Sequence, residues 1–343
     1  MSTIDASEIQ FPARLSLSQT PTPFYCLEQL SANLDGPRIW VKRDDLTECA
    51  ASGNKIRKLE FVLARAREAG CNVIITSGGL QSNHCRATAL LCARLGLRVH
   101  LLLRDEGDDS AVPDGNLMLD YLAGAEVSIY PRQQFLREQA DLVDHWRQHY
   151  ENEGLKPWVI PVGASDGHGV WGYVRCAQEL AADFDRAGIA PRRVFHATGS
   201  GGTQAGLTVG TAAYCPGVTV TGFAVCDDER YFLDKVRSDL RHWKSLYSLS
   251  VDVESLTISV NDRYVGPGYG VANDDVYATI RYVAAMEGLI LDPVYSGKAF
   301  HGLLEEILAG RWEGEDDIVF VHTGGIFGLM AQRPELGFRR PPR

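Results

Sequence analysis

The sequence lacks several features that would place the protein outside the ordinary globular class. No stretch approaches the roughly 18 apolar residues of a membrane span, and residues 1–19 lack a basic segment followed by an apolar one. The eight cysteines include no Cys-x-x-Cys pair, which argues against a zinc ribbon and against a disulfide framework. We therefore expect a protein that is neither membrane-bound nor exported, and a reducing cytoplasm fits best.

The sequence also has fewer basic than acidic residues. Lys and Arg total 34 against 44 Asp and Glu, which gives a net charge of -10. That charge would repel phosphate backbones and anionic membranes, so we expect neither nucleic acid nor a membrane as partner. With 45% hydrophobic residues the chain can build a large core, and a length of 343 residues suggests two domains.

Short β-rich runs alternate with longer stretches of helical periodicity along the chain. The expected strands are residues 39–42, 72–76, 99–103, 126–130, 157–161, 194–197, 218–225 and 318–322. Strands separated by about ten or more helical residues need crossover connections, which make parallel sheets covered by helices on both faces. The pattern predicts an α/β protein.

Two lysines stand three residues apart at the start of a predicted helix. The helix is expected over residues 55–69, with Asn54 before it and Gly70 after it, and it places Lys55 and Lys58 on one face. Neighbouring ammonium groups repel, which depresses the proton affinity of one of them, and a lysine with a lowered pKa suits Schiff-base chemistry. The common alternative is a pair of solvated lysines.

A glycine-rich loop directly follows the expected strand 194–197. It reads Thr198, Gly199, Ser200, Gly201, Gly202, Thr203, and a helix is expected from about Gln204. Backbone N–H groups, the helix dipole and the hydroxyls favour a phosphorylated ligand, although a tight turn is the simpler alternative. Gln204 replaces the third glycine of a dinucleotide fingerprint, and no Gly-Lys-Ser/Thr follows as in a P-loop.

Three further segments place polar side chains at turns. Residues 77–84 form a second strand, turn and helix start that suits a carboxylate, with Ser82, Asn83 and His84 at its mouth, although helix capping is the commoner use. Tyr269 and Tyr295 lie in glycine-rich turns, and Thr323 follows the last strand at the edge where open α/β sheets place ligands. Buried core tyrosines are the alternative there. We assign no metal, because His145 and His149 have no third ligand.

Taken in order, the lysine turn, the Gln-Ser-Asn-His helix start, the glycine-rich loop and the Asp-Pro-Val-Tyr-Ser-Gly-Lys segment resemble a known family. They are similar to fold-type II pyridoxal 5′-phosphate (PLP) enzymes of the D-cysteine desulfhydrase and 1-aminocyclopropane-1-carboxylate deaminase group. The resemblance covers residues 17–329. It implies a tryptophan synthase β-like α/β fold with two open parallel-sheet domains and the cofactor in the cleft. Residues 1–57 and 164–343 would form the large domain and 58–163 a small inserted one, in a homodimer that takes a small amino-acid substrate.

The resemblance also implies a role for each motif. Lys55 would bind PLP covalently, Lys58 would contact the phosphate, and the loop from Thr198 to Thr203 would cradle it. Asn83 would hydrogen-bond the phenolic oxygen of PLP, while Ser82, with neighbouring N–H groups and His84, would hold the substrate carboxylate. Tyr295 would stack on the cofactor ring, and Tyr269 would stand near the reacting carbon.

Two positions discriminate within this group. Deaminases resemble one another in carrying Glu after the stacking tyrosine and Leu before the final Gly-Gly, whereas this chain has Ser296 and Thr323, as desulfhydrases do. A carboxylate beside the pyridine nitrogen keeps it protonated and the ring a strong electron sink, which opening a cyclopropane requires; a hydroxyl leaves a weaker sink that suffices for β-elimination.

The prediction is therefore a PLP-dependent carbon–sulfur lyase that converts D-cysteine to pyruvate, ammonia and hydrogen sulfide. The alternatives are 1-aminocyclopropane-1-carboxylate deaminase, cysteate sulfo-lyase and a PLP pathway enzyme acting on a related amino acid. Ser52 departs from the family pattern, because many bacterial members have glycine there.

Overall fold

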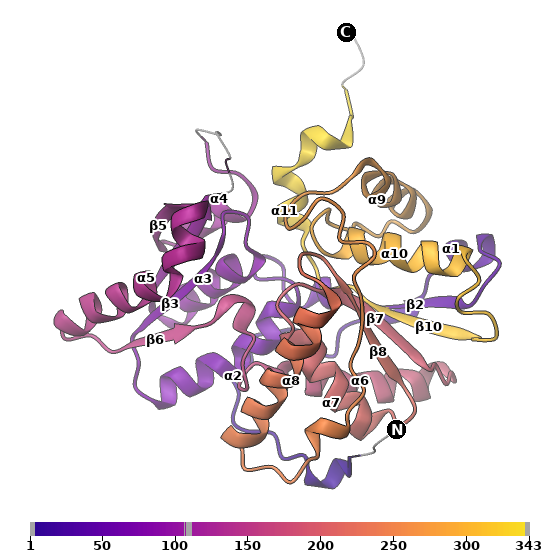
Figure 1. The fold of residues 1–343 in the computed structure, drawn as a ribbon, viewed down its shortest axis with the longest axis horizontal. Coiled ribbons are helices and arrows are strands. Elements are labelled where there is room, and N and C mark those ends of the chain that lie inside the picture. The colour runs from indigo at the N-terminus through magenta and orange to yellow at the C-terminus, as the bar shows by residue number, and fades with distance from the viewer. Residues whose placement is uncertain (1–3, 106, 108–111, 340–343) are drawn as a thin grey trace.

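The computed structural model describes residues 4–105, 107 and 112–339, and contains two separate β-sheets (Figure 1). The six-stranded sheet has the order β1 (Phe24–Cys26), β2 (Arg38–Lys42), β10 (Asp317–Val321), β7 (Arg193–Thr198), β8 (Thr219–Ala224) and β9 (Ser259–Asn261). The four-stranded sheet has the order β5 (Glu126–Pro131), β4 (Arg98–Asp105), β3 (Val73–Gly79) and β6 (Pro157–Ile160).

Each strand expected from the sequence is present, with small shifts of its bounds, and the α/β prediction is confirmed. Strands β1 and β9 are additional, and at three residues each they are too short to show a periodicity. The expectation of parallel pairing is wrong at one edge, where β1 pairs antiparallel with β2. The remaining strand pairs of the described chain are parallel.

Helices cover both faces of each sheet. They are α1 (Glu28–Asn33), α2 (Asn54–Glu68), α3 (Asn83–Leu95), α4 (Gly115–Leu122), α5 (Arg132–Asn152), α6 (Val170–Ala187), α7 (Gly202–Tyr214), α8 (Glu229–Leu246), α9 (Asp274–Glu287), α10 (Ser296–Leu308) and α11 (Ile326–Ala331). In the described part of the chain, none of them is long and apolar enough to cross a membrane.

Alternate residues of the strands point to opposite faces of each sheet, so each face packs into its own hydrophobic core. In the larger sheet Phe195 and Phe320 pack with α9 and α10, whereas their neighbours Val194 and Val319 pack with α6 and α7. In the smaller sheet β3 and β4 pack against α2 and α3 on one face and against α5 on the other. Both sheets are thus buried on both sides, as apolar parallel strands require.

A buried ion network anchors the helix that carries Lys55. Arg57 of α2 donates two hydrogen bonds of 2.8 Å to the carboxylate of Asp44 and two of 2.9 Å to Glu179 of α6. Tyr173 of α6 also donates to Asp44, at 2.7 Å. The guanidinium of Arg57 holds the pKa of Asp44 below its usual value against the opposing effect of burial. The network fixes the first turn of α2 against the larger sheet's helices.

Candidate active site

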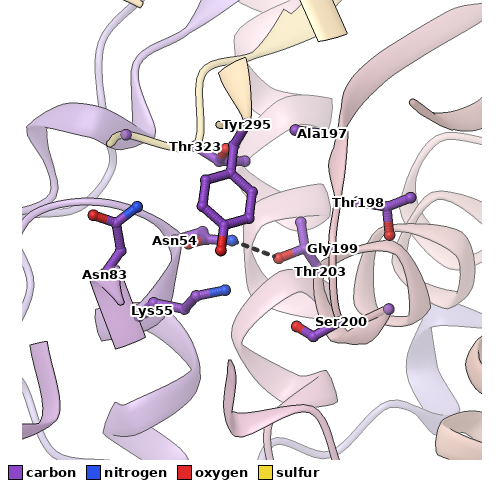
Figure 2. Close-up of a pocket in the computed structure, with 12 residues that line it drawn as sticks. Asn54, Lys55, Asn83, Ala197, Thr198, Gly199, Ser200, Thr203, Tyr295 and Thr323 are labelled. Carbon is purple, nitrogen blue, oxygen red and sulfur yellow. Dashed lines mark hydrogen bonds between the residues drawn. The ribbon is translucent and has the colours of Figure 1, made fainter. Parts of the chain in front are cut away.

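A pocket lies where five segments that are distant in sequence converge (Figure 2). They are the starts of α2 and α3, the loop between β7 and α7, the turn before α10 and the end of β10. Its lining residues are Asn54, Lys55, Asn83, Ala197, Thr198, Gly199, Ser200, Gly201, Thr203, Tyr295, Thr323 and Gly324. The structure thus brings most of the predicted cofactor residues together.

A wider cleft shares Lys55, Gly199, Ser200 and Tyr295 with this pocket. Three more of the predicted residues line it, namely Ser82, His84 and Tyr269. The predicted substrate residues therefore face the same space as Lys55. Lys58, Gly202 and Ser296 line neither cavity, for the reasons given below.

The helix that carries Lys55 begins one residue earlier than expected, at Asn54, with Gly53 as its N-cap. Gly53 has φ +101°, and a Cβ there would lie 2.8 Å from the carbonyl oxygen of Thr323, so only glycine fits. Asn54 is consequently free of a capping role. Its side chain donates to Thr203 Oγ1 at 3.0 Å, and its backbone N–H donates to the Thr323 carbonyl at 3.0 Å. Sequence reasoning missed Asn54 as a site residue because its partner lies 149 residues away.

The pKa of Lys55 is lowered to about 8, and burial is the cause. The pKa of Lys58 lies well below its usual value, first through burial and then through the charge of Lys55. The repulsion expected between the two lysines thus acts on Lys58. A lowered pKa alone does not identify the functional amine, because burial also lowers that of Lys298 to about 8. The Lys298 ammonium donates to the carbonyls of Val265 and Gly268, both at 2.7 Å, whereas Lys55 points into the pocket.

The glycine-rich loop is followed by α7, which begins at Gly202 rather than near Gln204. The N–H of Gly202 and the ammonium of Lys58 both donate to Ser165 Oγ at 3.2 Å, and Ser200 Oγ lies 2.8 Å from that oxygen. Two donors predicted to hold a phosphate, Lys58 and the Gly202 N–H, are therefore directed to Ser165. This explains why Lys58 and Gly202 do not line the pocket. Sequence reasoning missed Ser165, which belongs to none of the motifs; its position shortly after an expected strand was the only hint.

The start of α3 combines capping with first-turn N–H groups that have no partner within the helix. Ser82 Oγ accepts from the Cys85 N–H at 3.2 Å, so the capping interpretation holds, and the hydroxyl proton stays free for another acceptor. The Ser82 N–H donates a hydrogen bond to the Gly79 carbonyl, at 3.0 Å. The N–H groups of Asn83 and His84, in the first turn, are the donors left for an anion.

His84 is buried, with 2% of its surface exposed, so it is not a surface residue. Its Nε2 lies 2.8 Å from Thr76 Oγ1, and the Thr76 hydroxyl donates to the Ile160 carbonyl. Nε2 must therefore carry the proton, which makes Nδ1 the acceptor. Burial, followed by the charges of Lys55 and Lys58, holds the pKa of His84 well below its usual value. The ring is neutral at physiological pH.

Tyr269 and Tyr295 meet through their hydroxyls, which lie 2.6 Å apart, with their rings at 75°. Burial raises the pKa of Tyr269 to about 12 and that of Tyr295 well above its usual value, so both are protonated at neutral pH. The Arg104 guanidinium, on β4 of the smaller sheet, lies 5.7 Å from the Tyr269 ring centroid. The turn that carries Tyr269 thus contacts the smaller sheet across the cleft.

Ser296 and Thr323, which the resemblance paired at the pyridine nitrogen, occupy different environments. Thr323 lines the pocket. Ser296 is buried at the start of α10, where its hydroxyl donates to Asp292 Oδ1 at 2.7 Å and accepts from the Asp292 N–H at 2.9 Å. The hydrogen bonds to Asp292 turn the Ser296 hydroxyl into this turn, so Ser296 does not line the pocket, and its contact with the cofactor stays a prediction.

A comparison with protein families decides what this pocket belongs to. The family described as "Pyridoxal-phosphate dependent enzyme" matches residues 15–324, which is most of the chain. The chain belongs to this family. The fold-type II class is thereby confirmed, and PLP is its cofactor.

Curated relatives of this PLP-dependent enzyme match nearly its full length. The chain is 39% identical to "D-cysteine desulfhydrase" of Serratia proteamaculans over 336 residues, covering 95% of the chain and 98% of the relative. It is 38% identical to "Bifunctional D-cysteine desulfhydrase/1-aminocyclopropane-1-carboxylate deaminase, mitochondrial" of Arabidopsis thaliana, covering 92% and 78%. A crystal structure described as an "ACC deaminase homologue" matches with a TM-score of 0.85 and 34% identity, covering 94% of this chain and 95% of the other.

The pocket of this PLP-dependent enzyme has the donors that PLP needs. Lys55 offers an amine to the aldehyde, and the loop before α7 offers N–H groups and hydroxyls to the phosphate. Thr198 lines the pocket, and its Oγ1 is buried without a hydrogen-bond partner among the described residues, so this hydroxyl remains available to a polar ligand. The residues present fit the cofactor.

The pKa of Lys55 predicts how the apoenzyme takes up PLP. Only the neutral amine attacks an aldehyde, and below about pH 8 most Lys55 is protonated. We expect the reconstitution rate to rise about tenfold per pH unit below pH 8 and to level off above it. Stopped-flow absorbance of apoenzyme mixed with PLP measures this rate; a rate that keeps rising to pH 10 would show an unperturbed lysine instead.

Proposed function

We propose that this enzyme is a β-eliminating carbon–sulfur lyase that converts D-cysteine and water to pyruvate, ammonia and hydrogen sulfide. One observation carries the choice of reaction: no Asp or Glu is among the described residues that line the cofactor pocket, and Thr323 stands there with a hydroxyl. Without a carboxylate to protonate it, the pyridine nitrogen stays neutral, which suits departure of a thiolate better than opening of a cyclopropane. The names of the relatives support the same activity.

Each site residue has a part in this proposal. When bound, PLP supplies the electron sink that stabilises negative charge at the substrate α-carbon. Lys55 holds the cofactor and takes the α-proton, for which a pKa near neutrality is suited. The N–H groups at the start of α3, with the Ser82 hydroxyl, bind the substrate carboxylate.

The remaining residues bind the cofactor and handle the leaving group. Asn83 would donate to the phenolic oxygen of PLP, Tyr295 would pack on its ring, and Thr323 rather than Ser296 would face the pyridine nitrogen. The Tyr269 hydroxyl, protonated at neutral pH, holds a proton for the departing sulfur. Lys58 acts on the phosphate site through Ser165.

The domain organisation and assembly belong to the same proposal. The four-stranded sheet is built from residues 73–160, inside the small domain expected over 58–163, and the six-stranded sheet is built from strands on either side of it. This supports a large domain of 1–57 and 164–343. We also propose that the enzyme works as a cytoplasmic homodimer, which sedimentation velocity of the purified protein and fractionation of cells would test.

Purified holoenzyme incubated with each enantiomer of cysteine tests the function. We expect D-cysteine to give pyruvate and sulfide in equal amounts, with L-cysteine slower by at least about tenfold, or about 1.4 kcal/mol in the transition state. Pyruvate is followed with lactate dehydrogenase and sulfide with methylene blue. Sulfide without pyruvate, or no reaction with D-cysteine, would contradict the proposal.

The deaminase is the second candidate, because a relative that matches most of its own length carries both activities in its name. The same holoenzyme supplied with 1-aminocyclopropane-1-carboxylate would then release 2-oxobutyrate. A rate of 2-oxobutyrate release above that of pyruvate from D-cysteine would favour the deaminase. It would also contradict the argument that a pocket lining without Asp or Glu favours β-elimination.

A further inference from the structure

A buried arginine stands directly behind the pocket without lining it. Arg86 lies on α3 with no exposed surface. Its Nη1 donates to Asn83 Oδ1 at 3.3 Å and to Asn116 Oδ1 of α4 at 2.9 Å, and its Nη2 donates to the Ser52 carbonyl at 2.6 Å. It therefore touches Asn83 and the loop before Lys55 at once.

A guanidinium carries hydrogen-bond donors and no acceptor. The atom that Asn83 presents to Arg86 must therefore be its carbonyl oxygen, which leaves the amide nitrogen on the opposite side. Figure 2 shows this arrangement, with the Asn83 nitrogen toward the pocket and its oxygen turned away. Without Arg86 the amide could rotate and present its oxygen to the pocket at little cost, because the two ends have nearly the same shape.

The guanidinium is itself held from several sides. Asn116 donates through Nδ2 to the Gln81 carbonyl at 3.0 Å, so its own oxygen must face Arg86. The centroid of the Phe327 ring, on α11, lies 4.7 Å from Arg86 Cζ. Burial lowers the pKa of Arg86 to about 10, with Asp120 and Glu48 opposing, so the group stays charged at neutral pH. Arg86 is thus a fixed, permanent donor.

We propose that Arg86 is a positioning residue that orients the Asn83 amide so that its N–H donates to the phenolic oxygen of bound PLP. This rests on the role proposed above for Asn83. A donor at that oxygen stabilises its deprotonated form, whereas a carbonyl oxygen in the same place would repel it. Losing the donor makes the oxygen more basic, and the change is visible in the absorption spectrum of the bound cofactor.

A pH titration of the visible spectrum of the holoenzyme tests the proposal without substrate. The proteins are wild type, Asn83→Ala, Arg86→Gln and the double variant. We expect the spectral pKa to rise by about 1 unit in Asn83→Ala and in Arg86→Gln, which is the effect of one hydrogen bond to a charged oxygen. The double variant should equal Asn83→Ala, since Arg86 acts through Asn83.

Arg94→Gln is the matched control, because Arg94 lies on the same helix and donates to the distant Leu17 carbonyl, at 3.3 Å, rather than to a residue of the pocket. Its spectral pKa should equal that of the wild type. If the spectral pKa shifts in Asn83→Ala but not in Arg86→Gln, the inference about Arg86 is overturned while the role of Asn83 stands. Additive shifts of the spectral pKa in the double variant would have the same meaning. No shift in either single variant would overturn it together with the role of Asn83.

Arg86→Lys decides the question if Arg86→Gln does not fold or bind PLP. A lysine keeps the charge but offers one point of donation in place of the fork that spans Asn83, Asn116 and Ser52. We expect a spectral pKa between those of wild type and Asn83→Ala. A wild-type value would overturn the proposal. Turnover of D-cysteine enters none of these outcomes, so a different physiological substrate would leave the result readable.

Discussion

Lys55→Ala is expected to eliminate the covalent attachment of PLP and to lower turnover of D-cysteine by at least about 10⁴-fold. The variant loses both the amine that holds the cofactor and the base that takes the α-proton, and a positioned base alone is worth up to about that factor. No other amine lines the cofactor pocket in the described chain. Neither Lys58, directed to Ser165, nor Lys298, directed to backbone carbonyls, is placed to replace it.

Borohydride reduction followed by peptide mass spectrometry measures the attachment directly. The wild type should carry the PLP mass on Lys55, and the variant should carry none. Lys156→Ala serves as the control, because Lys156 is an exposed lysine outside both cavities and should retain adduct and activity. A wild-type adduct on Lys58 or Lys298 would show that the amine has been misassigned.

Asp44→Ala is expected to destabilise the fold by about 3–5 kcal/mol, the cost of removing one partner from a buried ion pair. Asp44 is fully buried and accepts hydrogen bonds from Arg57, Thr22 and Tyr173. Its loss leaves part of the Arg57 charge uncompensated. Urea unfolding followed by circular dichroism measures the change, and an effect below about 1 kcal/mol would contradict the assigned network.

The neighbouring Asp45 offers a matched control. It pairs with Arg43 in a more exposed position, so Asp45→Ala should cost about 0–1 kcal/mol. The pH dependence has a definite sign. Because the pKa of Asp44 is lowered in the folded state, its contribution is present above its unfolded value of about 3.9 and disappears as the pH falls through the folded value. The Asp44→Ala variant should therefore converge with wild type only in strong acid.

Much of the site could be predicted from sequence because its residues lie in local patterns. The strands show their periodicity, and the lysine turn and glycine-rich loop each sit between a strand and a helix. Residues whose contacts are distant in sequence could not be found in this way. Ser165 meets Lys58 across 107 residues and Arg86 meets Asn116 across 30, and neither pair has a local signature.

At Ser296 the motif and the structure differ in where they direct the side chain. Its place in a motif predicted a contact with the cofactor, but a position beside Tyr295 does not determine where a side chain points. The Asp292 carboxylate accepts from the backbone N–H groups of Val294, Tyr295 and Ser296 and from the Ser296 hydroxyl. These hydrogen bonds direct the Ser296 hydroxyl toward Asp292. The direction of the side chain thus depends on backbone geometry rather than on residue type.

The first turn of α2 limits how the reactive amine could be engineered. Lys55 faces the pocket, Arg57 is tied to the carboxylates of Asp44 and Glu179, and Lys58 is tied to Ser165. Successive residues of a helix point about 100° apart, so these three side chains fix its rotation about its axis. A lysine transplanted to position 56, where Ile56 packs in the core, would point away from the pocket, and rotating the helix to correct this would break both anchors. Redesign for new substrates is better directed at the opposite wall of the cleft.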